Sequence, residues 1–365
     1  MKISITQGEL NTALQTIQKA VSSRSILPIL SGILFVVEDG YLNLCSTDLE
    51  LSMKYRLPIS AEDADAAVLP ARLMGDVVKN LPDAKVELDI DNKSGNVRIT
   101  CGSSLFSLKA FSAEDFPKFP ETKAEKTIKV PGKKISSAIR QVMKAVSKDE
   151  TRPVLCGILT TIDKGRLKMV ATDSYRLSIN ETAVDGAKAD DMKVIIPARC
   201  MDEVSKICGD EDIEIGLAKN QVYFKMNDTV VVSRLIEGNF PPYQQLLPDN
   251  CETRVKLMKD DFLASLRRVS LLAQNNALIK IRIDKEKVQL SAMTADVGSA
   301  DEALPAEVAG EGMEIAFNAQ YLIDGLNSIS EEQVYLELNN PLKPGLVRPA
   351  KAQDFIYLVM PVRIG

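Results

Sequence analysis

Residues 27–57 read LPILSGILFVVEDGYLNLCSTDLELSMKYRL, and residues 152–182 read RPVLCGILTTIDKGRLKMVATDSYRLSINET. The two stretches align without gaps, so that Thr47-Asp48 falls on Thr172-Asp173. A third, weaker copy covers residues 276–308, with Thr294-Ala295-Asp296 in place of the Thr-Asp pair. Self-similarity at a long, regular interval indicates a chain built from repeated structural units.

The flanks of these stretches repeat as well. Apolar residues recur at helical spacing before each copy, which predicts an amphipathic helix each time: Leu10, Leu14, Ile17 and Val21; Ile135, Ile139, Val142 and Val146; Phe262, Leu266, Val269 and Leu272. A second short amphipathic helix is predicted to open at Leu69-Pro70-Ala71-Arg72, Ile196-Pro197-Ala198-Arg199 and Phe317-Asn318-Ala319-Gln320. Each copy therefore contains two helices.

Between the helices, apolar and polar residues alternate as in strands. Val86-Glu87-Leu88-Asp89-Ile90 is one example, and Asp39-Gly40 and Lys164-Gly165 supply turns between strands. The order in each copy is strand, helix, three strands, then the same again, with about eight strands in all. The fold class is α+β, in three repeated domains at 1–122, 127–248 and 252–365 that each pack two helices on antiparallel sheets.

Composition narrows the possible functions. The chain has 365 residues, a net charge of −5 and no histidine, and no two of its six cysteines form a Cys-x-x-Cys pair. Metal sites and Ser-His or Cys-His nucleophiles are therefore not expected, and no cofactor is predicted. The N-terminal residues lack the apolar core of a signal peptide, which favours a cytoplasmic location.

Several stretches resemble bacterial DNA sliding clamps over the whole chain. They are Arg24-Ser25-Ile26-Leu27-Pro28-Ile29-Leu30-Ser31-Gly32, Thr172-Asp173-Ser174-Tyr175-Arg176-Leu177, Gly238-Asn239-Phe240-Pro241-Pro242-Tyr243 and Val359-Met360-Pro361-Val362-Arg363-Ile364. The resemblance implies a head-to-tail homodimeric ring that encircles duplex DNA, lined by helices with the sheets outside. It also implies a clamp loader and polymerases or repair proteins as partners. No Gly-x-x-x-x-Gly-Lys-Ser/Thr motif is present, so ATP use is assigned to the loader.

The chain departs from the family pattern in three places. Ser174-Tyr175 replaces a Gly-His pair of some members, Gln244 and Gln245 replace arginines, and Gly365 extends the C-terminus by one residue. We expect these changes to alter partner affinity and to leave the fold intact.

The helix from Ile135 to Val146 and its flanks carry positive charge only: Lys133, Lys134, Arg140, Lys144 and Lys148. One-signed charge opposite an apolar stripe suggests a facing polyanion, but an ordinary basic surface explains it equally well. The family resemblance favours the interpretation that this helix faces DNA. Arg24 is the first candidate for DNA contact, and the resemblance extends the DNA-binding set to Arg72, Lys148 and Arg199. Few such contacts give weak, sequence-independent binding, which lets a ring slide.

The resemblance also implies a groove for short linear peptides shared by polymerases and the loader. Its predicted lining comes from the second and third copies: Leu155, Thr172, Ser174, Tyr175, Arg176, Leu177, Pro241, Leu246, Val359, Met360, Pro361 and Val362. An extended peptide with apolar anchors needs such a cleft, and methionine adapts to several partners. The alternative is that these are core residues, which is strongest for Leu155 and Val359.

Two further assignments concern the dimer and the repeated Thr-Asp pairs. The resemblance places Phe106 of one subunit against Leu271 and Leu272 of the other, with burial in each domain's own core as the alternative. Asp48, Asp173 and Asp296 occupy equivalent places in the copies. Because one chemical site needs no three scattered copies, turn capping explains them better than catalysis.

Two other functions compete with the non-catalytic clamp. An enzyme would need a nucleophile or metal constellation, and the sequence offers none. A repeat scaffold that binds peptides but not DNA would have the same groove. Retention on closed circular DNA distinguishes the two, because only the clamp would remain on the circle.

Overall fold

The structure is a computed structural model that describes residues 2–22, 27–61, 65–91, 94–124, 126–184, 192–273 and 277–363. The chain divides into two compact units, Met1–Lys133 with Lys206–Leu235 and Lys134–Ser205 with Ile236–Gly365. Strands of the central sequence copy belong to both units, so the repeat and the compact unit are different divisions of the chain.

The first copy contains two α-helices, α1 (Gln7–Ile17) and α2 (Ala71–Lys79). Its strands are β1 (Lys2–Thr6), β2 (Gly32–Glu38), β3 (Tyr41–Thr47), β4 (Leu51–Pro58), β5 (Ser60–Ala61), β6 (Asp65–Pro70), β7 (Lys85–Asp91), β8 (Asn96–Cys101) and β9 (Ser104–Lys109).

The second copy contains α3 (Gly132–Met143) and α4 (Ala198–Ile207), and the third contains α5 (Lys259–Ser270) and α6 (Ala319–Asn327). Strands of the second copy are β10 (Lys126–Pro131), β11 (Gly157–Asp163), β12 (Arg166–Thr172), β13 (Arg176–Ala183), β14 (Met192–Pro197), β15 (Asp212–Ala218), β16 (Gln221–Met226) and β17 (Thr229–Arg234). Strands of the third are β18 (Thr253–Met258), β19 (Leu278–Ile283), β20 (Lys287–Thr294), β21 (Gly298–Pro305), β22 (Glu307–Ala309), β23 (Met313–Asn318), β24 (Gln333–Leu338), β25 (Gly345–Pro349) and β26 (Phe355–Val359).

The second copy has the predicted succession of strand, helix and three strands, given twice, and the first and third copies have the same succession with one short additional strand each, β5 and β22. Local chemistry explains the boundaries of these elements. The Thr6 side chain accepts from the Glu9 N–H and the Glu9 carboxylate accepts from the Thr6 N–H, so a capping box starts α1. Asp39-Gly40 and Lys164-Gly165 all have positive φ, between 48° and 75°, which is the geometry of two-residue hairpin turns.

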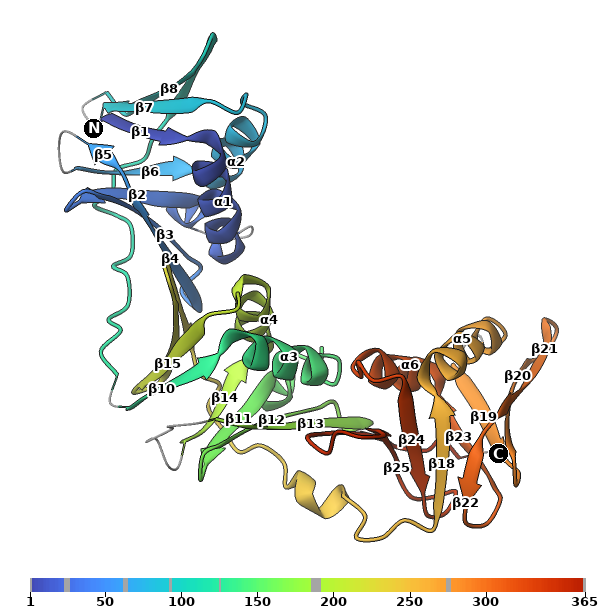
Figure 1. Cartoon of the computed structure of the whole chain (residues 1–365). Helices are drawn as coiled ribbons and strands as arrows, with labels where there is room; N and C mark the ends of the chain where they lie inside the picture. Colours follow the sequence, from blue (N-terminus) through green and yellow to red (C-terminus); the bar gives the residue numbers. More distant parts are fainter. Residues whose placement is uncertain are drawn as a thin grey trace. The chain divides into compact units, whose positions relative to one another are not determined.

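The first unit holds two antiparallel sheets of order β5-β1-β7-β8-β9 and β10-β15-β16-β17-β4-β3-β2-β6. The second sheet joins the first and second copies, because β17 pairs with β4 from Thr229↔Tyr55 to Ser233↔Leu51. In Figure 1, α1 and α2 lie side by side, α1 contacting β3 and β4 and α2 contacting β2 and β6. The predicted stripe residues Leu10, Leu14 and Ile17 are buried beneath α1.

The second unit holds sheets of order β14-β11-β12-β13-β26-β25-β24-β18-β22 and β21-β20-β19-β23. Here β13 of the second copy pairs with β26 of the third, from Arg176↔Val359 to Asn180↔Phe355. Helices α5 and α6 lie side by side (Figure 1), and α5 packs on β18 to β21. The stripe residues Ile135, Ile139 and Val142 of α3 and Phe262, Leu266 and Val269 of α5 are buried as predicted.

The six cysteines all lie in described residues and are free thiols; Cys45, Cys101 and Cys200 are buried, and Cys251 is exposed. In the described part of the chain, no helix is long and apolar enough to cross a membrane. Short 3-10 helices precede β2 at Pro28–Ser31 and β11 at Pro153–Leu155 and occur at Gln18–Ala20 and Tyr243–Leu246.

Candidate functional site

The turn between β12 and β13 is held by its own side chains. The Asp173 carboxylate accepts hydrogen bonds from the N–H groups of Tyr175 and Arg176, both at 3.0 Å, and the Thr172 hydroxyl accepts from Ser174 at 3.1 Å. Ser174 has a φ of 82°, in the left-handed region. The Thr47-Asp48 turn repeats this pattern through Leu49, whose φ is 77°. Turn capping is thereby confirmed for Asp48 and Asp173.

The third copy differs from the other two at this turn. The Thr294 hydroxyl donates to the Leu272 carbonyl at 2.6 Å, and Asp296 has a positive φ of 64°. Among the described residues of this turn, no backbone N–H donates to the Asp296 carboxylate in the way seen at Asp48 and Asp173.

Beside the Thr172–Leu177 turn lies an apolar cluster shared by the second and third copies. Its buried members are Leu159, Val170, Leu177, Ile179, Ile195, Tyr243, Leu346 and Leu358. Partly buried residues cover it, among them Val154, Phe240, Leu247 and Met360. We call these four residues, together with Ser174, Tyr175, Pro241, Leu246, Pro361 and Val362, the junction surface. The Met360 N–H donates to the Tyr175 carbonyl at 2.8 Å and fixes the C-terminal strand against the turn.

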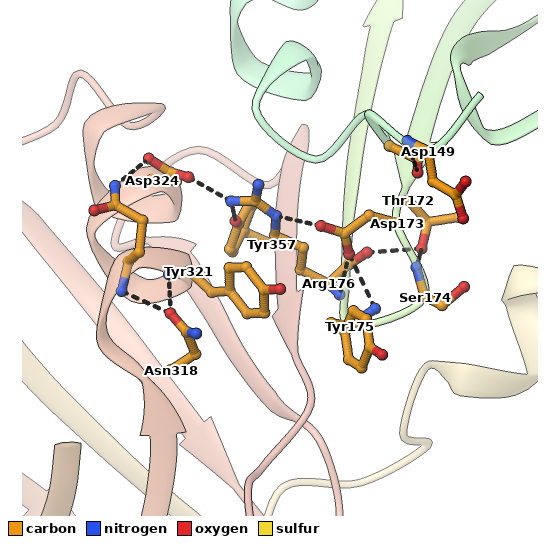
Figure 2. Close-up of polar contacts among 12 residues, drawn as sticks. Asp149, Thr172, Asp173, Ser174, Tyr175, Arg176, Asn318, Tyr321, Asp324 and Tyr357 are labelled. Atoms are coloured by element: carbon orange, nitrogen blue, oxygen red, sulfur yellow. Dashed lines mark hydrogen bonds and ion pairs between the residues drawn. The ribbon is translucent and has the colours of Figure 1, made fainter. Parts of the chain in front are cut away.

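Arg176 connects this turn to the third copy (Figure 2). Its Nε donates to Asp173 at 2.9 Å, and its Nη1 donates to Asp324 of α6 and to the Tyr357 hydroxyl, the latter at 3.2 Å. The guanidinium also lies over the Tyr321 ring, 4.5 Å from its centroid. Tyr175 stacks on the same Tyr321 ring at a centroid distance of 6.3 Å.

Burial and neighbouring charges shift the pKa values of Arg176 and Tyr357. Burial by itself lowers the pKa of Arg176, but its contacts with Tyr357, Asp324 and Asp173 outweigh this and raise it, so the guanidinium stays charged. Burial raises the pKa of the Tyr357 hydroxyl above its ordinary value, and the nearby Arg176 only partly offsets this. The hydroxyl is therefore neutral at physiological pH and accepts a hydrogen bond from Arg176.

The structure divides the predicted peptide-binding residues into two layers. Leu155, Thr172, Leu177 and Val359 are buried, so the core alternative describes their side chains. The exposed or partly exposed layer contains Ser174, Tyr175, Pro241, Leu246, Met360, Pro361 and Val362, with Tyr175 59% exposed. Arg176 is mostly buried, and its guanidinium is directed to carboxylates rather than to the surface.

Sequence reasoning missed several residues of this site. Tyr321 and Asp324 on α6 and Tyr357 on β26 contact Arg176, although they lie far from it in the chain. Only the three-dimensional pairing of β13 with β26 brings them together. Phe240 and Tyr243 lay inside a stretch that signalled the family and could have been included.

The junction between the first and second copies, in the first unit, has an equivalent backbone hydrogen bond between residues with different side chains. The Arg234 N–H donates to the Glu50 carbonyl at 3.0 Å, as Met360 does to Tyr175. The two side chains form an exposed ion pair with 3.5 Å between Arg234 Nη1 and Glu50 Oε1. Equivalent positions thus carry opposite charges at one junction and apolar groups at the other.

The predicted DNA-binding residues lie on or beside helices. Arg72 on α2, Arg199 on α4 and Lys148 after α3 are exposed. Arg72 forms a 4.0 Å ion pair with Asp76, one helical turn away. On α3, Arg140 is exposed and donates to the Ser205 carbonyl at 3.4 Å. Arg24 lies outside the described residues.

Two of the three predicted dimer residues, Phe106 and Leu271, are exposed rather than buried in the core of their own domain. Phe106 is 39% exposed on β9, an edge strand of the five-stranded sheet, and its neighbour Leu105 is also exposed. Leu271 is 72% exposed, and Leu272 is partly buried. A Cβ at Gly298, the first residue of edge strand β21, would lie 3.7 Å from Leu272.

Family models of the DNA polymerase III beta subunit match the chain in three consecutive parts. The N-terminal domain matches residues 1–120, the central domain 129–242 and the C-terminal domain 244–363. The chain belongs to the DNA polymerase III beta subunit family, the beta sliding clamps.

Curated relatives and solved structures agree with this membership. The beta sliding clamp of Bacillus subtilis (strain 168) is 30% identical over 377 residues and covers 100% of both chains. That of Staphylococcus aureus (strain N315) is 32% identical over 376 residues, covering 100% of this chain and 99% of the relative. The crystal structure of the B. subtilis DNA polymerase sliding clamp has a TM-score of 0.95 at 30% identity, with both chains fully covered. A Pseudomonas aeruginosa sliding clamp bound to griselimycin has a TM-score of 0.96 at 28% identity, again with full coverage.

Membership in the sliding-clamp family confirms the resemblance and the fold class of three α+β clamp domains with antiparallel sheets. Sliding clamps are non-catalytic accessory subunits of DNA polymerase III, so the prediction that the chain is not itself an enzyme is also confirmed. Within the described residues, no group of three or more His, Cys, Asp or Glu side chains is arranged to hold a metal ion.

Proposed function

We propose that two copies of this chain close head to tail into a ring that encircles duplex DNA and tethers polymerases to it. The observation that carries the proposal is a strand pairing that occurs twice within the chain and leaves two matching edges. β4 pairs with β17, and β13 pairs with β26. In the third copy the counterpart of β4 and β13 is β21, and in the first copy the counterpart of β17 and β26 is β9. Both β21 and β9 lie at the edge of their sheets.

The equivalence rests on the threonines of the repeat. β4, β13 and β21 begin at Leu51, Arg176 and Gly298, each of which follows Thr47, Thr172 or Thr294 at the same spacing. The first residue of β17 pairs with the fifth of β4, as Thr229↔Tyr55, and the first of β26 pairs with the fifth of β13, as Phe355↔Asn180. The same register between subunits pairs Ser104 with Glu302 and Phe106 with Ala300. A contact of this type is heterologous, and it closes into a ring when the rotation between copies allows it.

Exposed apolar side chains at these edges support the assignment. Leu105 and Phe106 lie on β9, and Leu271 and Leu272 directly follow α5, with Leu272 beside the start of β21. An open strand edge with apolar flanks readily pairs with another chain. At the centre of the proposed interface, β9 of one subunit pairs with β21 of the other and extends the sheet. At its margin, Phe106 packs against Leu271 and Leu272.

The charge distribution fits retention by encirclement. The net charge of −5 opposes strong overall attraction to DNA, whereas α3 contains no acidic residue and carries Lys133, Lys134 and Arg140. Arg24, Arg72, Lys148 and Arg199 complete the proposed contacts with phosphates. Such contacts are sequence-independent and weaken as salt rises.

Loading onto circular DNA tests this function. The chain is loaded with its clamp loader, washed at a salt concentration that removes it from short linear duplex, and the circle is then cut. Encirclement predicts retention on the closed circle, loss after cutting, and retention after cutting when both ends are blocked. Equal retention on closed and on cut, unblocked DNA would show that affinity holds the protein. A scaffold that binds only peptides would not remain on any of these DNAs.

The partners proposed at the junction surface are polymerases, repair proteins and the loader, each through a short extended peptide. An apolar surface beside a preformed cluster, with one adaptable methionine, suits peptides with apolar anchors. We place the protein in the cytoplasm with the replication machinery. The three domains are proposed to span 1–122, 127–248 and 252–365, close to the segments that the family models match.

A further inference from the structure

We propose that Arg176 is a positioning residue for the junction surface and makes no peptide contact through its guanidinium, and that Asp324 and Tyr357 act with it. The inference rests on the proposed function, because it concerns how the peptide site is held in shape. Arg176 is in the second copy, and Asp324 and Tyr357 are in the third, so their contacts tie together the two sides of the surface.

Two of the three guanidinium nitrogens, Nε and Nη1, are bound within the protein. The side chain of Arg176 is only 11% exposed, and Asp173 and Asp324, its two carboxylate partners, are 14% and 15% exposed. The Tyr357 hydroxyl accepts from the same Nη1 that donates to Asp324. Charge-assisted bonds of this kind are strong and directional, so a peptide carboxylate that approaches Nε or Nη1 would have to displace partners already in place.

Each carboxylate partner is itself fixed by its own copy. One oxygen of Asp173 accepts from the N–H groups of Tyr175 and Arg176, and the other accepts from Arg176 Nε. On α6, Gln320 Nε2 donates to one oxygen of Asp324 at 2.8 Å, while Arg176 binds the other. The guanidinium therefore connects the Thr172–Leu177 turn rigidly to α6.

Tyr321 connects Arg176 to the exposed residues of the junction surface. Arg176 lies over the Tyr321 ring, and Tyr175 stacks on that ring. The carbonyl of Tyr175 in turn accepts from the Met360 N–H at 2.8 Å. Loss of the Arg176 link would free Tyr175 and Met360 to move together. In the first copy the equivalent position is Leu51, a buried residue with no charge, so this link is specific to the junction that carries the apolar surface.

The test measures peptide affinity in variants that do not touch the surface. Overlapping fluorescein-labelled peptides spanning the replicative polymerase of the same organism identify one that binds the native dimer, and this peptide is the probe. Asp324→Ala, Tyr357→Phe, Arg176→Ala, Arg176→Lys and the double variant Arg176→Ala/Asp324→Ala are titrated by fluorescence anisotropy. Glu181→Gln, which removes charge from another partly buried ion-paired carboxylate of the same unit, is the control.

A positioning role predicts that Asp324→Ala weakens the peptide by about tenfold or more, although Asp324 does not line the surface. Arg176→Ala should weaken it to a similar extent, and the double variant no further than the larger single effect, because both remove one link. Arg176→Lys should recover part of the affinity. A 19F signal from 3-fluorotyrosine at position 175 should shift in Asp324→Ala and stay unchanged in Glu181→Gln.

Other results would overturn the proposal. If Arg176→Ala loses affinity while Asp324→Ala binds as the native chain does, Arg176 is a direct peptide contact. If neither variant changes affinity while Met360→Arg abolishes binding, the peptide site stands and the positioning role fails. If Met360→Arg binds the peptide as tightly as the native chain, the proposed site itself is wrong, and the inference falls with it. Tyr357→Phe removes a single oxygen atom and leaves the buried ring in place, so we expect this variant to disturb the fold least.

Discussion

The backbone N–H of Met360 donates a 2.8 Å hydrogen bond to the carbonyl oxygen of Tyr175. The same contact links Arg234 to Glu50 at 3.0 Å at the other junction of the chain. The same backbone hydrogen bond therefore occurs between an apolar pair, Tyr175 and Met360, at one junction and between an exposed ion pair, Glu50 and Arg234, at the other. The side chains at these two positions are free to differ without disturbing the sheet, which makes them suitable targets for substitution.

Exchanging one pair for the other should remove peptide binding without unfolding the protein. In Tyr175→Glu/Met360→Arg the junction surface receives the charges of Glu50 and Arg234. Desolvating charged groups against apolar peptide anchors costs several kcal/mol, which is enough to erase a micromolar contact worth about 8 kcal/mol. Anisotropy titration should show no saturable binding. A melting temperature close to that of the native chain would establish that the fold is intact, and retained affinity would contradict the assigned site.

The proposed strand register can be tested by crosslinking. If β9 of one subunit pairs with β21 of the other in the register of the two internal junctions, Ser107 lies opposite Ser299. Ser107→Cys/Ser299→Cys should then form a disulfide-linked dimer, because directly opposed residues fall within the Cα separation that a disulfide spans. Ser107→Cys/Asp301→Cys, shifted along the strand, is the control and should crosslink poorly on non-reducing gels. The reverse preference would rule out this register.

Phe106→Asp should shift the dimer towards monomer while leaving the fold unchanged. Phe106 is partly exposed in the chain, so the charge costs little within the subunit, but it would be buried in the interface. Sedimentation at several concentrations measures the dissociation. Leu342→Asp replaces an apolar residue that is more exposed, at 72%, and not assigned to the interface, so its dimer should persist. Equal behaviour of the two variants would place the interface elsewhere.

The Glu302 carboxylate should titrate far below the usual range. Hydrogen bonds from Arg268, two at 2.7 Å, and from Ser265 lower its pKa to about 2. Because the folded-state pKa is depressed, the stabilisation is present above the ordinary Glu pKa of about 4.3 and is lost as the pH falls towards 2. NMR titration of 13C-labelled glutamate checks the value. In Arg268→Ala the midpoint should rise towards 4.3; an unchanged midpoint would contradict the assigned cause.

Gly325→Ala should destabilise the protein, although alanine is the better helix former. A Cβ at this position of α6 would overlap the buried ring of Tyr357. Overpacking of this kind costs about 1–3 kcal/mol, more than the gain in helix propensity. Gly8→Ala in α1 is the matched control, because nothing lies within 4 Å of its added Cβ, and it should stabilise by up to about 1 kcal/mol. Chemical denaturation of both variants measures the difference in sign.

The sequence by itself determined the repeat and, with it, most of the fold. Leu10, Leu14 and Ile17 recur at helical spacing, so a buried helix face follows from the chain alone. Asp39-Gly40 accepts positive φ at low cost, which specifies a hairpin wherever it separates two alternating stretches. These signals are local, because they depend on residues a few positions apart, and the threefold repetition made each one stronger. The exposed part of the candidate site, around Tyr175 and Met360, was also predicted through the family resemblance.

Only the tertiary structure decided which residues support that site. Asp324 and Tyr357 meet Arg176 because β13 pairs with β26, and this contact joins residues separated by more than a hundred positions. The sequence left two positions open for Leu155 and Val359, the groove or the core, with the core alternative strongest for these two, and packing buries both beneath the surface. Strand pairing between copies depends on shape and register over many residues at once. For that reason the helices and strands could be predicted from local sequence patterns, whereas the contacts between distant strands could be identified only in the folded structure.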